Sequence, residues 1–138
     1  MKIDPYLSFN GRADEAIEFY KSALGAKVNL LMRFKESPEK PAGGFPPETL
    51  NQVMHADLSI GHSRIFVTDG GCQSDKTLGG TTLSLQVTTD AEAEKRFIAL
   101  AEGGNITMQM NKTFFASAFG MLTDRFGVKW MVINQKPA

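Results

Sequence analysis

Two polar side chains on one predicted strand have the residue types and the spacing for acid–base chemistry. His55 and Asp57 are two residues apart, so strand alternation predicts that both share one face with Ser59. Asp57 could orient the imidazole, and His55 could then act as a general base near neutral pH. The simpler alternative is a surface or interface histidine beside an ordinary charged neighbour. One pair of this kind is weak evidence for a catalytic site, so the simpler alternative is preferred and catalysis stays open.

Two arginines on predicted strands are candidates for binding an anionic group of a ligand. Arg33 and Arg64 carry guanidinium groups, which pair bidentately with a carboxylate or a phosphonate. Arginine is mostly exposed in folded proteins, so a solvated strand arginine is the competing interpretation at each position. The two residues are therefore kept as predicted ligand contacts and not as an identified site.

Structural roles are predicted for the remaining reactive or aromatic residues. Cys72 follows two glycines and has no adjacent base, which indicates a loop thiol and not a nucleophile. Five large apolar residues gather near the end of the chain and are predicted in the core or a dimer interface: Phe114, Phe115, Phe119, Trp130 and Met131. Some of them must nevertheless line any apolar ligand cup.

Composition and charge exclude several functional classes. Fifteen basic residues balance fifteen acidic ones, so no electrostatic footprint for nucleic acid or an anionic membrane is expected. No apolar run approaches the roughly 18 residues of a membrane span. The first residues lack the apolar core of a signal peptide, and one cysteine permits no internal disulfide. We therefore expect a cytoplasmic protein whose partner is a small molecule, not nucleic acid or a membrane.

The first half of the chain is predicted to contain one helix and four strands. The helix follows Asn10-Gly11, carries an apolar stripe at helical spacing and ends at Gly25, where a left-handed cap is expected. The stripe consists of Ala13, Ala16, Ile17, Tyr20, Ala23 and Leu24. Alternating apolar residues predict strands at 3–9, 26–35, 53–60 and 64–68, the last two forming a hairpin around Gly61-His62.

Two segments are predicted as loops. Residues 36–52 contain four of the six prolines and Gly43-Gly44, and a loop of this length in a compact domain is often functional. Residues 69–80 are rich in Gly, Asp and Ser and are predicted as a linker. The linker separates a first module of about residues 1–70 from a second of about residues 80–138 within one domain.

The second half repeats the order of the first. A strand at 81–87 precedes a helix whose start has the capping-box spacing of Thr89 and Glu92, and three strands follow at 105–110, 116–123 and 128–134. The helices align because Phe19 and Phe97 are 78 residues apart, as are Gly25 and Gly103. Coincidence between two ordinary amphipathic helices is the alternative. A fixed internal period nevertheless predicts a duplicated structural unit.

The residues also resemble a known superfamily. The chain is similar to glyoxalase, bleomycin-resistance and extradiol-dioxygenase proteins, the vicinal oxygen chelate superfamily, and within it to the PhnB-like branch. The resemblance is carried by segments 5–11, 13–21, 24–26 and 55–58, and most specifically by 119–131. It implies an α+β fold in which two βαβββ modules form an open eight-stranded curved sheet, the glyoxalase-like fold, around a ligand cup. It also implies a homodimer.

The resemblance raises the question of a metal ion. Metal-dependent relatives hold one divalent ion with His and Glu side chains from four strand positions, which correspond here to Pro5, Phe66, Thr82 and Met131. Proline and phenylalanine cannot ligate, and methionine is too soft for the hard ions of this chemistry. We therefore expect no metal site and no cofactor. Strand alternation puts Thr82, Ser84 and Gln86 on the face away from the predicted helix, and the resemblance implies that this face lines the cup. The predicted ligand-binding residues are Arg33, Arg64, Phe66, Thr82, Gln86 and Met131.

Two functions follow as alternatives. The first is a PhnB-like protein that binds a small molecule in the cup without the usual metal site. The second is a metal-dependent lyase, isomerase or dioxygenase with unconventional ligands such as His55, Asp57 or Asp69. A methyltransferase activity, a name often attached to this branch, is disfavoured. The sequence has no Gly-rich strand-to-helix turn for the nucleotide part of a methyl donor, and 138 residues leave little room for a doubly wound sheet.

Overall fold

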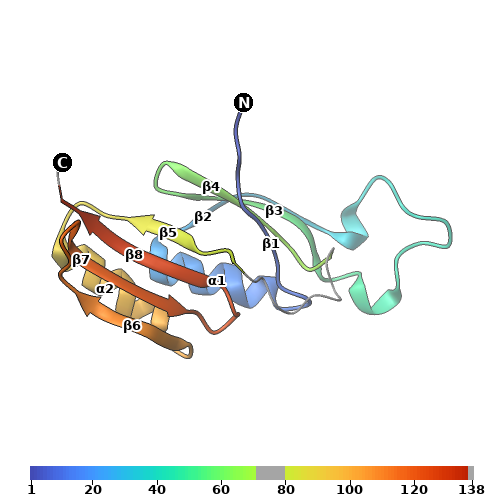
Figure 1. Ribbon diagram of the computed structural model, residues 1–138. Helices are drawn as coiled ribbons and strands as arrows, with labels where there is room; N and C mark the ends of the chain where they lie inside the picture. Colours follow the sequence, from blue (N-terminus) through green and yellow to red (C-terminus); the bar gives the residue numbers. More distant parts are fainter. Residues whose placement is uncertain (71–79, 137–138) are drawn as a thin grey trace. The chain divides into compact units, whose positions relative to one another are not determined.

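The computed structural model describes residues 1–70 and 80–136. The chain divides into two compact units, residues 1–76 and 77–138, which are described separately below. In the described residues, each unit contains one four-stranded sheet and one α-helix (Figure 1). The α+β class and the glyoxalase-like fold are therefore confirmed, with the eight strands divided between two separately hydrogen-bonded sheets. In the described residues, no helix is long and apolar enough to cross a membrane.

The first unit has the order strand, helix and three strands. Its elements are β1 (Tyr6–Ser8), α1 (Ala13–Leu24), β2 (Lys27–Arg33), β3 (Val53–Ile60) and β4 (Ser63–Thr68). The strands lie in the order β1-β4-β3-β2, with β1 parallel to β4 and the other neighbours antiparallel. The predicted loop between β2 and β3, cyan in Figure 1, contains two short 3₁₀ turns, Phe34–Glu36 and Pro47–Thr49.

The helix α1 forms for the reasons that its sequence indicates. All six residues of its predicted apolar stripe are buried. Gly25 ends the helix in the left-handed conformation, with φ 69°, and its N–H donates to the carbonyl of Lys21. Ala56, Leu58 and Val67 are fully buried on the two central strands, so one face of the sheet packs under α1.

The second unit repeats this topology. Its elements are β5 (Leu83–Gln86), α2 (Asp90–Ala101), β6 (Asn105–Asn111), β7 (Ala116–Thr123) and β8 (Lys129–Gln135). The strands lie in the order β5-β8-β7-β6, and β5 is parallel to β8. The predicted cap of α2 is confirmed, because the Thr89 hydroxyl accepts a hydrogen bond from the Glu92 N–H at 3.1 Å.

The core of the second unit depends on close helix–sheet packing. Phe97 and Leu100 of α2 are buried, as are Leu122, Trp130 and Val132 of the sheet. At the centre of β7, a Cβ on Gly120 would lie 2.6 Å from the Phe97 ring, so only glycine permits this approach.

The duplication extends to an irregularity of the sheets. In the first unit the β2–β3 register shifts between Val28, which pairs with Leu58, and Leu30, which pairs with Asp57. In the second unit the β6–β7 register shifts at the same place, between Ile106, paired with Leu122, and Met108, paired with Met121. Both shifts are β-bulges, which are structural features of a sheet and not defects. The shared bulge fixes which residues of the two units are equivalent.

Two strands and one loop end differ from the sequence prediction. The strands β1 and β5 are shorter than predicted, and Pro5, which has no N–H to donate to a ladder, directly precedes β1. Asp69, predicted as the first linker residue, is instead buried at the start of α1. The rest of the predicted linker and Cys72 lie outside the described residues, apart from Gly70 and Gly80.

Candidate functional site

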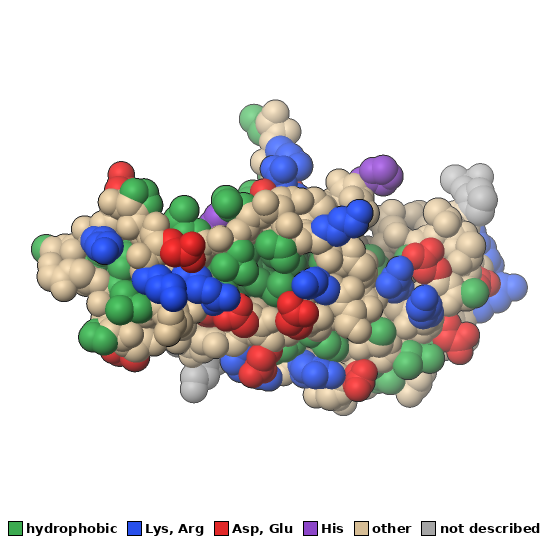
Figure 2. Space-filling model, turned by 180° about the vertical axis from the view of Figure 1, so that it is seen from behind, with side chains coloured by type: hydrophobic (Ala, Val, Ile, Leu, Met, Phe, Trp, Pro, Cys, Tyr) green, Lys and Arg blue, Asp and Glu red, His purple; other side chains and the backbone are tan. Residues whose placement is uncertain are grey.

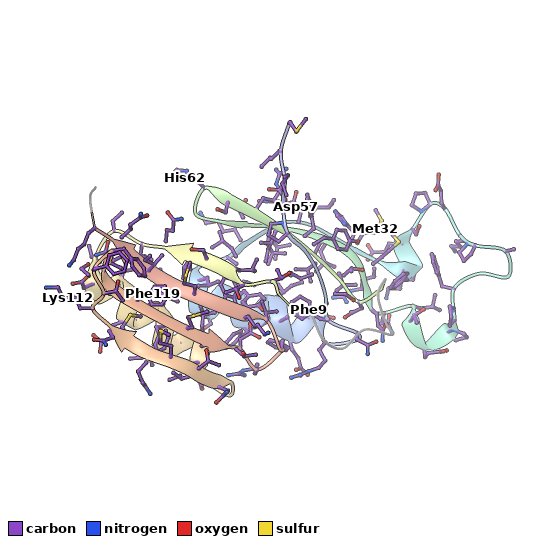
Figure 3. All side chains as sticks on the ribbon, in the orientation of Figure 1. Phe9, Met32, Asp57, His62, Lys112 and Phe119 are labelled. Atoms are coloured by element: carbon purple, nitrogen blue, oxygen red, sulfur yellow. The ribbon has the colours of Figure 1, made fainter. Side chains whose placement is uncertain are left out.

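The candidate site of the first unit is the sheet face opposite α1. Strand alternation puts Ala56 and Leu58 under the helix, so the residues between them point the other way. His55, Asp57 and Ser59 occupy this second face as predicted, and all three are partly accessible. Figure 3 labels Asp57 on β3, whereas His62 lies at the tip of the β3–β4 hairpin.

A polar cluster on this face is centred on Asp57. The Arg64 Nε is 3.1 Å from Asp57 Oδ1, and Asn29 donates hydrogen bonds to Asp57 Oδ1 at 3.3 Å and to Ser59 Oγ at 2.7 Å. The Asp57 side chain is 17% exposed. Burial of this degree makes an ion pair more favourable than one in open solvent, since water screens it less. The Asp57 carboxylate is therefore held by an arginine and an amide.

His55 makes an aromatic contact, and the possible orienting contact from Asp57 is not among its interactions in the described residues. Residues two apart on a strand are roughly 6.6 Å apart along the backbone, and the long Arg64 side chain reaches the carboxylate instead. The His55 ring stacks on Phe66, with centroids 5.3 Å apart and an angle of 28°. Tyr6 completes an aromatic cluster, with centroid distances of 6.2 Å to His55 and 6.3 Å to Phe66. Tyr6 is 58% exposed, so the cluster presents an aromatic surface to solvent.

Arg33, the other residue predicted to bind an anionic group, lies in a different environment. Its guanidinium donates to both carboxylate oxygens of Asp14 at 2.9 and 3.0 Å and to the carbonyl of Asn51 at 2.7 Å. The hydrogen bond to Asp14 raises the pKa of Arg33. Arg33 thereby connects the end of β2 to α1 and to the loop before β3, and in the described residues its side-chain hydrogen bonds go to Asp14 and Asn51 and not to the Asp57 cluster.

The four strand positions implied by the superfamily do not fit a divalent ion. Register places Tyr6 beside Phe66 and Ser84 beside Met131, whereas Pro5 and Thr82 precede the strands. No His or carboxylate occupies any of these positions, and hard divalent ions need such ligands. Among residues 1–70 and 80–136, no group of three or more His, Cys, Asp or Glu side chains could hold a metal ion.

Asp69, a ligand candidate of the metal-dependent alternative, has a structural role. Its Oδ1 accepts hydrogen bonds from the N–H groups of Gly11 at 2.8 Å and Ala13 at 2.9 Å, and its Oδ2 accepts one from Val53 at 3.0 Å. The side chain is buried and lies at the positive end of α1. The carboxylate therefore joins the start of the helix to β3 and β4.

The equivalent face of the second unit is rich in methionine. A cross-strand row runs through Ser84, Met131, Met121 and Met108, in register from β5 to β6. The next row contains Gln86, Ile133 and Phe119, the last labelled on β7 in Figure 3. Of the predicted site residues, Gln86 and Met131 therefore share this face, and Thr82 directly precedes β5.

Comparison with known proteins identifies the family of the chain. A family model described as 3-demethylubiquinone-9 3-methyltransferase matches residues 1–133. The chain belongs to this family. The protein YjdN of Escherichia coli K12 is 35% identical over 147 residues, covering 99% of each chain. Among solved structures, PA1353 of Pseudomonas aeruginosa has a TM-score of 0.83 and 40% identity, covering 96% of each chain.

Two further structures define the branch and the fold. The PhnB protein of Bacillus cereus, titled a putative 3-demethylubiquinone-9 3-methyltransferase, has a TM-score of 0.77 and 25% identity, covering 96% of this chain and 98% of its own. A glyoxylase/bleomycin resistance protein/dioxygenase domain of Frankia sp. EAN1pec, with a TM-score of 0.62 and 14% identity, covers 97% and 94% and shares the fold alone. The resemblance to PhnB-like proteins is thus confirmed, and the Frankia domain shows that the fold is glyoxalase-like.

The remaining aromatic residues of this PhnB-like chain divide between core and surface. Trp130 is buried and donates its Nε1–H to Asp124 at 2.9 Å. Phe114, Phe115 and Phe119 form edge-to-face contacts with centroid distances of 5.1 and 5.2 Å. Phe114 is almost fully exposed. Figure 2 shows acidic and basic side chains interspersed over one face of the molecule, without a large region of a single sign.

Sequence reasoning placed Ser84 on the cup face without naming it as a ligand contact, and it missed four residues of the two faces: Tyr6, Asn29, Met108 and Met121. One signal could have found the first of these. Tyr6 and Ser84 are 78 residues apart, the same interval that separates the two helices. The repeat interval therefore points to Tyr6 and Ser84 in preference to Pro5 and Thr82. Asn29 could not be found in this way, because the bulge that turns it toward Asp57 depends on sheet pairing.

Proposed function

We propose that this PhnB-like protein binds a small organic molecule on the face of its first sheet opposite α1, and that binding requires no divalent metal ion. The supporting observation is the exposed aromatic cluster of Tyr6, His55 and Phe66 beside the Asp57–Arg64 pair. Aromatic surfaces with a few fixed polar groups are typical of small-molecule sites.

The two parts of this face favour a planar ligand with polar substituents. A ring would stack against Tyr6 or Phe66, because aromatic pairs prefer offset or edge contacts at such distances. Substituents on that ring would then reach the guanidinium of Arg64 and the amide of Asn29. Since Asp57 already holds both groups in place, they would lose little conformational entropy on binding.

Metal-dependent chemistry is the competing function, and the contacts of its candidate ligands weigh against it. Both oxygens of Asp69 accept backbone hydrogen bonds, and Asp57 is paired with Arg64. Using either carboxylate for a metal would break these contacts. A divalent ion present in stoichiometric amount after purification without added metal, measured by elemental analysis, would favour this alternative.

The methyltransferase activity in the family's description is not part of the proposal. A dinucleotide or methyl-donor site of the doubly wound type needs an open helix N-terminus after the first strand. Here the N–H groups of Gly11 and Ala13 already bind the carboxylate of Asp69. Within each described sheet only one neighbouring pair of strands is parallel. This arrangement differs from a doubly wound parallel sheet.

A ligand screen with matched variants tests the proposal. Protein treated with a chelator is screened against a panel of small aromatic compounds by thermal shift, and positives are titrated by calorimetry. Tyr6→Ser and Phe66→Leu should each weaken binding at least fivefold, because an aromatic contact contributes about 1 kcal/mol or more. Phe114→Leu, an exposed site in the other unit, should have no effect.

The outcome that contradicts the proposal is equally definite. If only divalent ions raise the melting temperature and no aromatic compound does, metal-free binding is refuted. If a compound binds but Tyr6→Ser and Phe66→Leu bind it as well as the natural protein, the location on this face is wrong.

Assembly and location are part of the same proposal. The likeness to the superfamily supports a homodimer, and the single cysteine fits the reducing cytoplasm. Light scattering coupled to size-exclusion chromatography would measure the mass of the assembly. A mass equal to one 15.1 kDa chain would contradict the homodimer.

A further inference from the structure

We propose that the free edge of β6 pairs with β6 of a second copy of this chain, as two antiparallel strands related by a two-fold axis at Met108. The inference rests on the homodimer proposed above and names the surface that forms it. It makes no use of the ligand face of the first unit, so the two proposals can be tested separately.

The strand β6 is the outer strand of its sheet and is accessible along its length. It ends the order β5-β8-β7-β6, so in the described residues β7 is its one partner strand (Figure 1). Six of its seven residues are exposed, and the apolar side chains of Ile106 and Met108 are 38% and 48% exposed. A free edge presents a row of backbone donors and acceptors, which is a template for another strand.

The edge of β6 lacks the charges that protect the equivalent edge of the first unit. There β2 is the outer strand, with Lys27 at its start and Arg33 at its end. The positions 78 residues later are Asn105 and Asn111, and β6 contains neither a charged residue nor a proline. Charged side chains and proline are common means by which edge strands avoid pairing. Both strands contain bulges, so the difference between the two edges is one of charge.

The sequence of β6 is nearly symmetric about its central residue, Met108. It reads Asn-Ile-Thr-Met-Gln-Met-Asn, so amide, apolar and polar residues lie at equal distances on both sides of the centre. The two register shifts of β6 against β7 also lie on either side of Met108. A strand of this kind matches itself when it is reversed, as a closed two-fold interface requires.

Antiparallel pairing about Met108 joins residues of like chemistry. Met108 of one copy lies opposite Met108 of the other. Ile106 then lies opposite Met110, and Asn105 lies opposite Asn111, each of the second copy. These pairs provide apolar contacts at the centre and hydrogen bonds between amide groups at both ends.

The same pairing brings opposite charges together beyond the strand ends. Lys112 directly follows Asn111, and Glu102 lies three residues before Asn105. Pairing Asn111 with Asn105 of the second copy therefore brings Lys112 toward Glu102 of that copy, and the two-fold axis produces this contact twice. Both side chains are exposed, and neither forms a salt bridge in the described part of the chain. The second copy thus complements the charge at each end of the edge.

The first experiment measures the mass of the assembly by light scattering coupled to size-exclusion chromatography. The natural protein should have twice the 15.1 kDa of one chain. Met108→Glu should have the mass of one chain, because the two-fold axis sets two carboxylates directly opposite each other. Leu30→Glu is the matched control, since Leu30 is the equivalent residue of β2 and is 51% exposed. This control should keep the mass of two chains.

A cross-link tests the register of the pairing. In a Cys72→Ser background, Met108→Cys places two thiols on opposite strands with Cα atoms roughly 5 Å apart, a distance that a disulfide spans. Mild oxidation should convert this variant to a covalent dimer on a non-reducing gel. Leu30→Cys in the same background should remain a single chain.

A charge exchange tests the ends of the edge. Lys112→Glu should raise the dissociation constant of the dimer about tenfold, measured by analytical ultracentrifugation, because an exposed ion pair is lost at two symmetric places. Adding Glu102→Lys to this variant restores opposite charges and should return the dissociation constant to its natural value.

The results that overturn the inference differ from those that overturn the homodimer. A folded Met108→Glu variant, verified by circular dichroism, that remains dimeric would show that the dimer forms through another surface. Absence of the covalent dimer in Met108→Cys, or of rescue by Glu102→Lys, would refute the pairing about Met108. A natural protein with the mass of one chain would refute both the edge pairing and the homodimer.

Discussion

Replacing Asp69 by asparagine should destabilise the protein more than a typical isosteric substitution does. The natural carboxylate is 2% exposed and accepts three backbone N–H groups, from Gly11, Ala13 and Val53. The asparagine oxygen can replace Oδ1 and still accept from Gly11 and Ala13. Its NH₂ group then faces the N–H of Val53, and two buried donors oppose each other.

The magnitude follows from these contacts. A hydrogen bond to a charged group contributes about 2 kcal/mol, and a buried N–H without an acceptor costs about 1 to 2 kcal/mol. The lost negative charge at the N-terminus of α1 adds about 0.5 kcal/mol. We therefore expect Asp69→Asn to lower the free energy of unfolding by about 3.5 to 4.5 kcal/mol, a large part of the roughly 5 to 15 kcal/mol of a typical domain.

Urea unfolding followed by circular dichroism measures this difference as a shift in the transition midpoint at constant slope. Glu94→Gln removes a carboxylate from the exposed surface of α2 and should change the free energy of unfolding by less than about 0.5 kcal/mol. A loss in Asp69→Asn no larger than that of this control would refute the assigned role of the three hydrogen bonds.

Two other substitutions test local packing and electrostatics. Gly104→Ala would place a Cβ against the carbonyl oxygen of Thr123. We therefore expect this substitution to lower the free energy of unfolding by about 3 kcal/mol, as measured by urea unfolding. Asn105→Ala, at the adjacent exposed position, should lower it far less. Hydrogen bonds from Ser117, and then from Asn134, lower the pKa of Asp90 from its ordinary value of 3.8. The ionised form of Asp90 therefore favours the folded state above pH 3.8, and this contribution is lost as the pH falls through the folded-state pKa. Ser117→Ala should raise the pKa of Asp90 toward 3.8 in an NMR titration, and an unchanged pKa would show that the Ser117 hydrogen bond is not its main cause.

The repeat has a consequence for how the two faces diverged. The units share topology, helix placement and bulge position, yet one face carries an ion pair and aromatic rings and the other carries methionines. The shared features position the buried core, because in each unit the helix packs on one face of its sheet. The side chains opposite the helices are not needed for that core, so they were able to change independently.

The sequence by itself determined the features that depend on near neighbours. The bounds of α1, the Gly25 cap, the Thr89 cap and the β3–β4 hairpin each follow from residues within a few positions, and all were predicted. The 78-residue interval also required no structure, because two copies of one unit repeat their local signals. The opposite faces of β3 could be assigned as well, since alternation is a property of a single strand.

Only the tertiary structure decided which side chains meet. Asp57 had a sequence neighbour of suitable chemistry in His55, but Arg64 of the next strand is its partner. Asp69 looked like the start of a linker and is the buried acceptor of three distant N–H groups. Such contacts depend on cross-strand register, which a β-bulge shifts by one residue without a clear sequence signal.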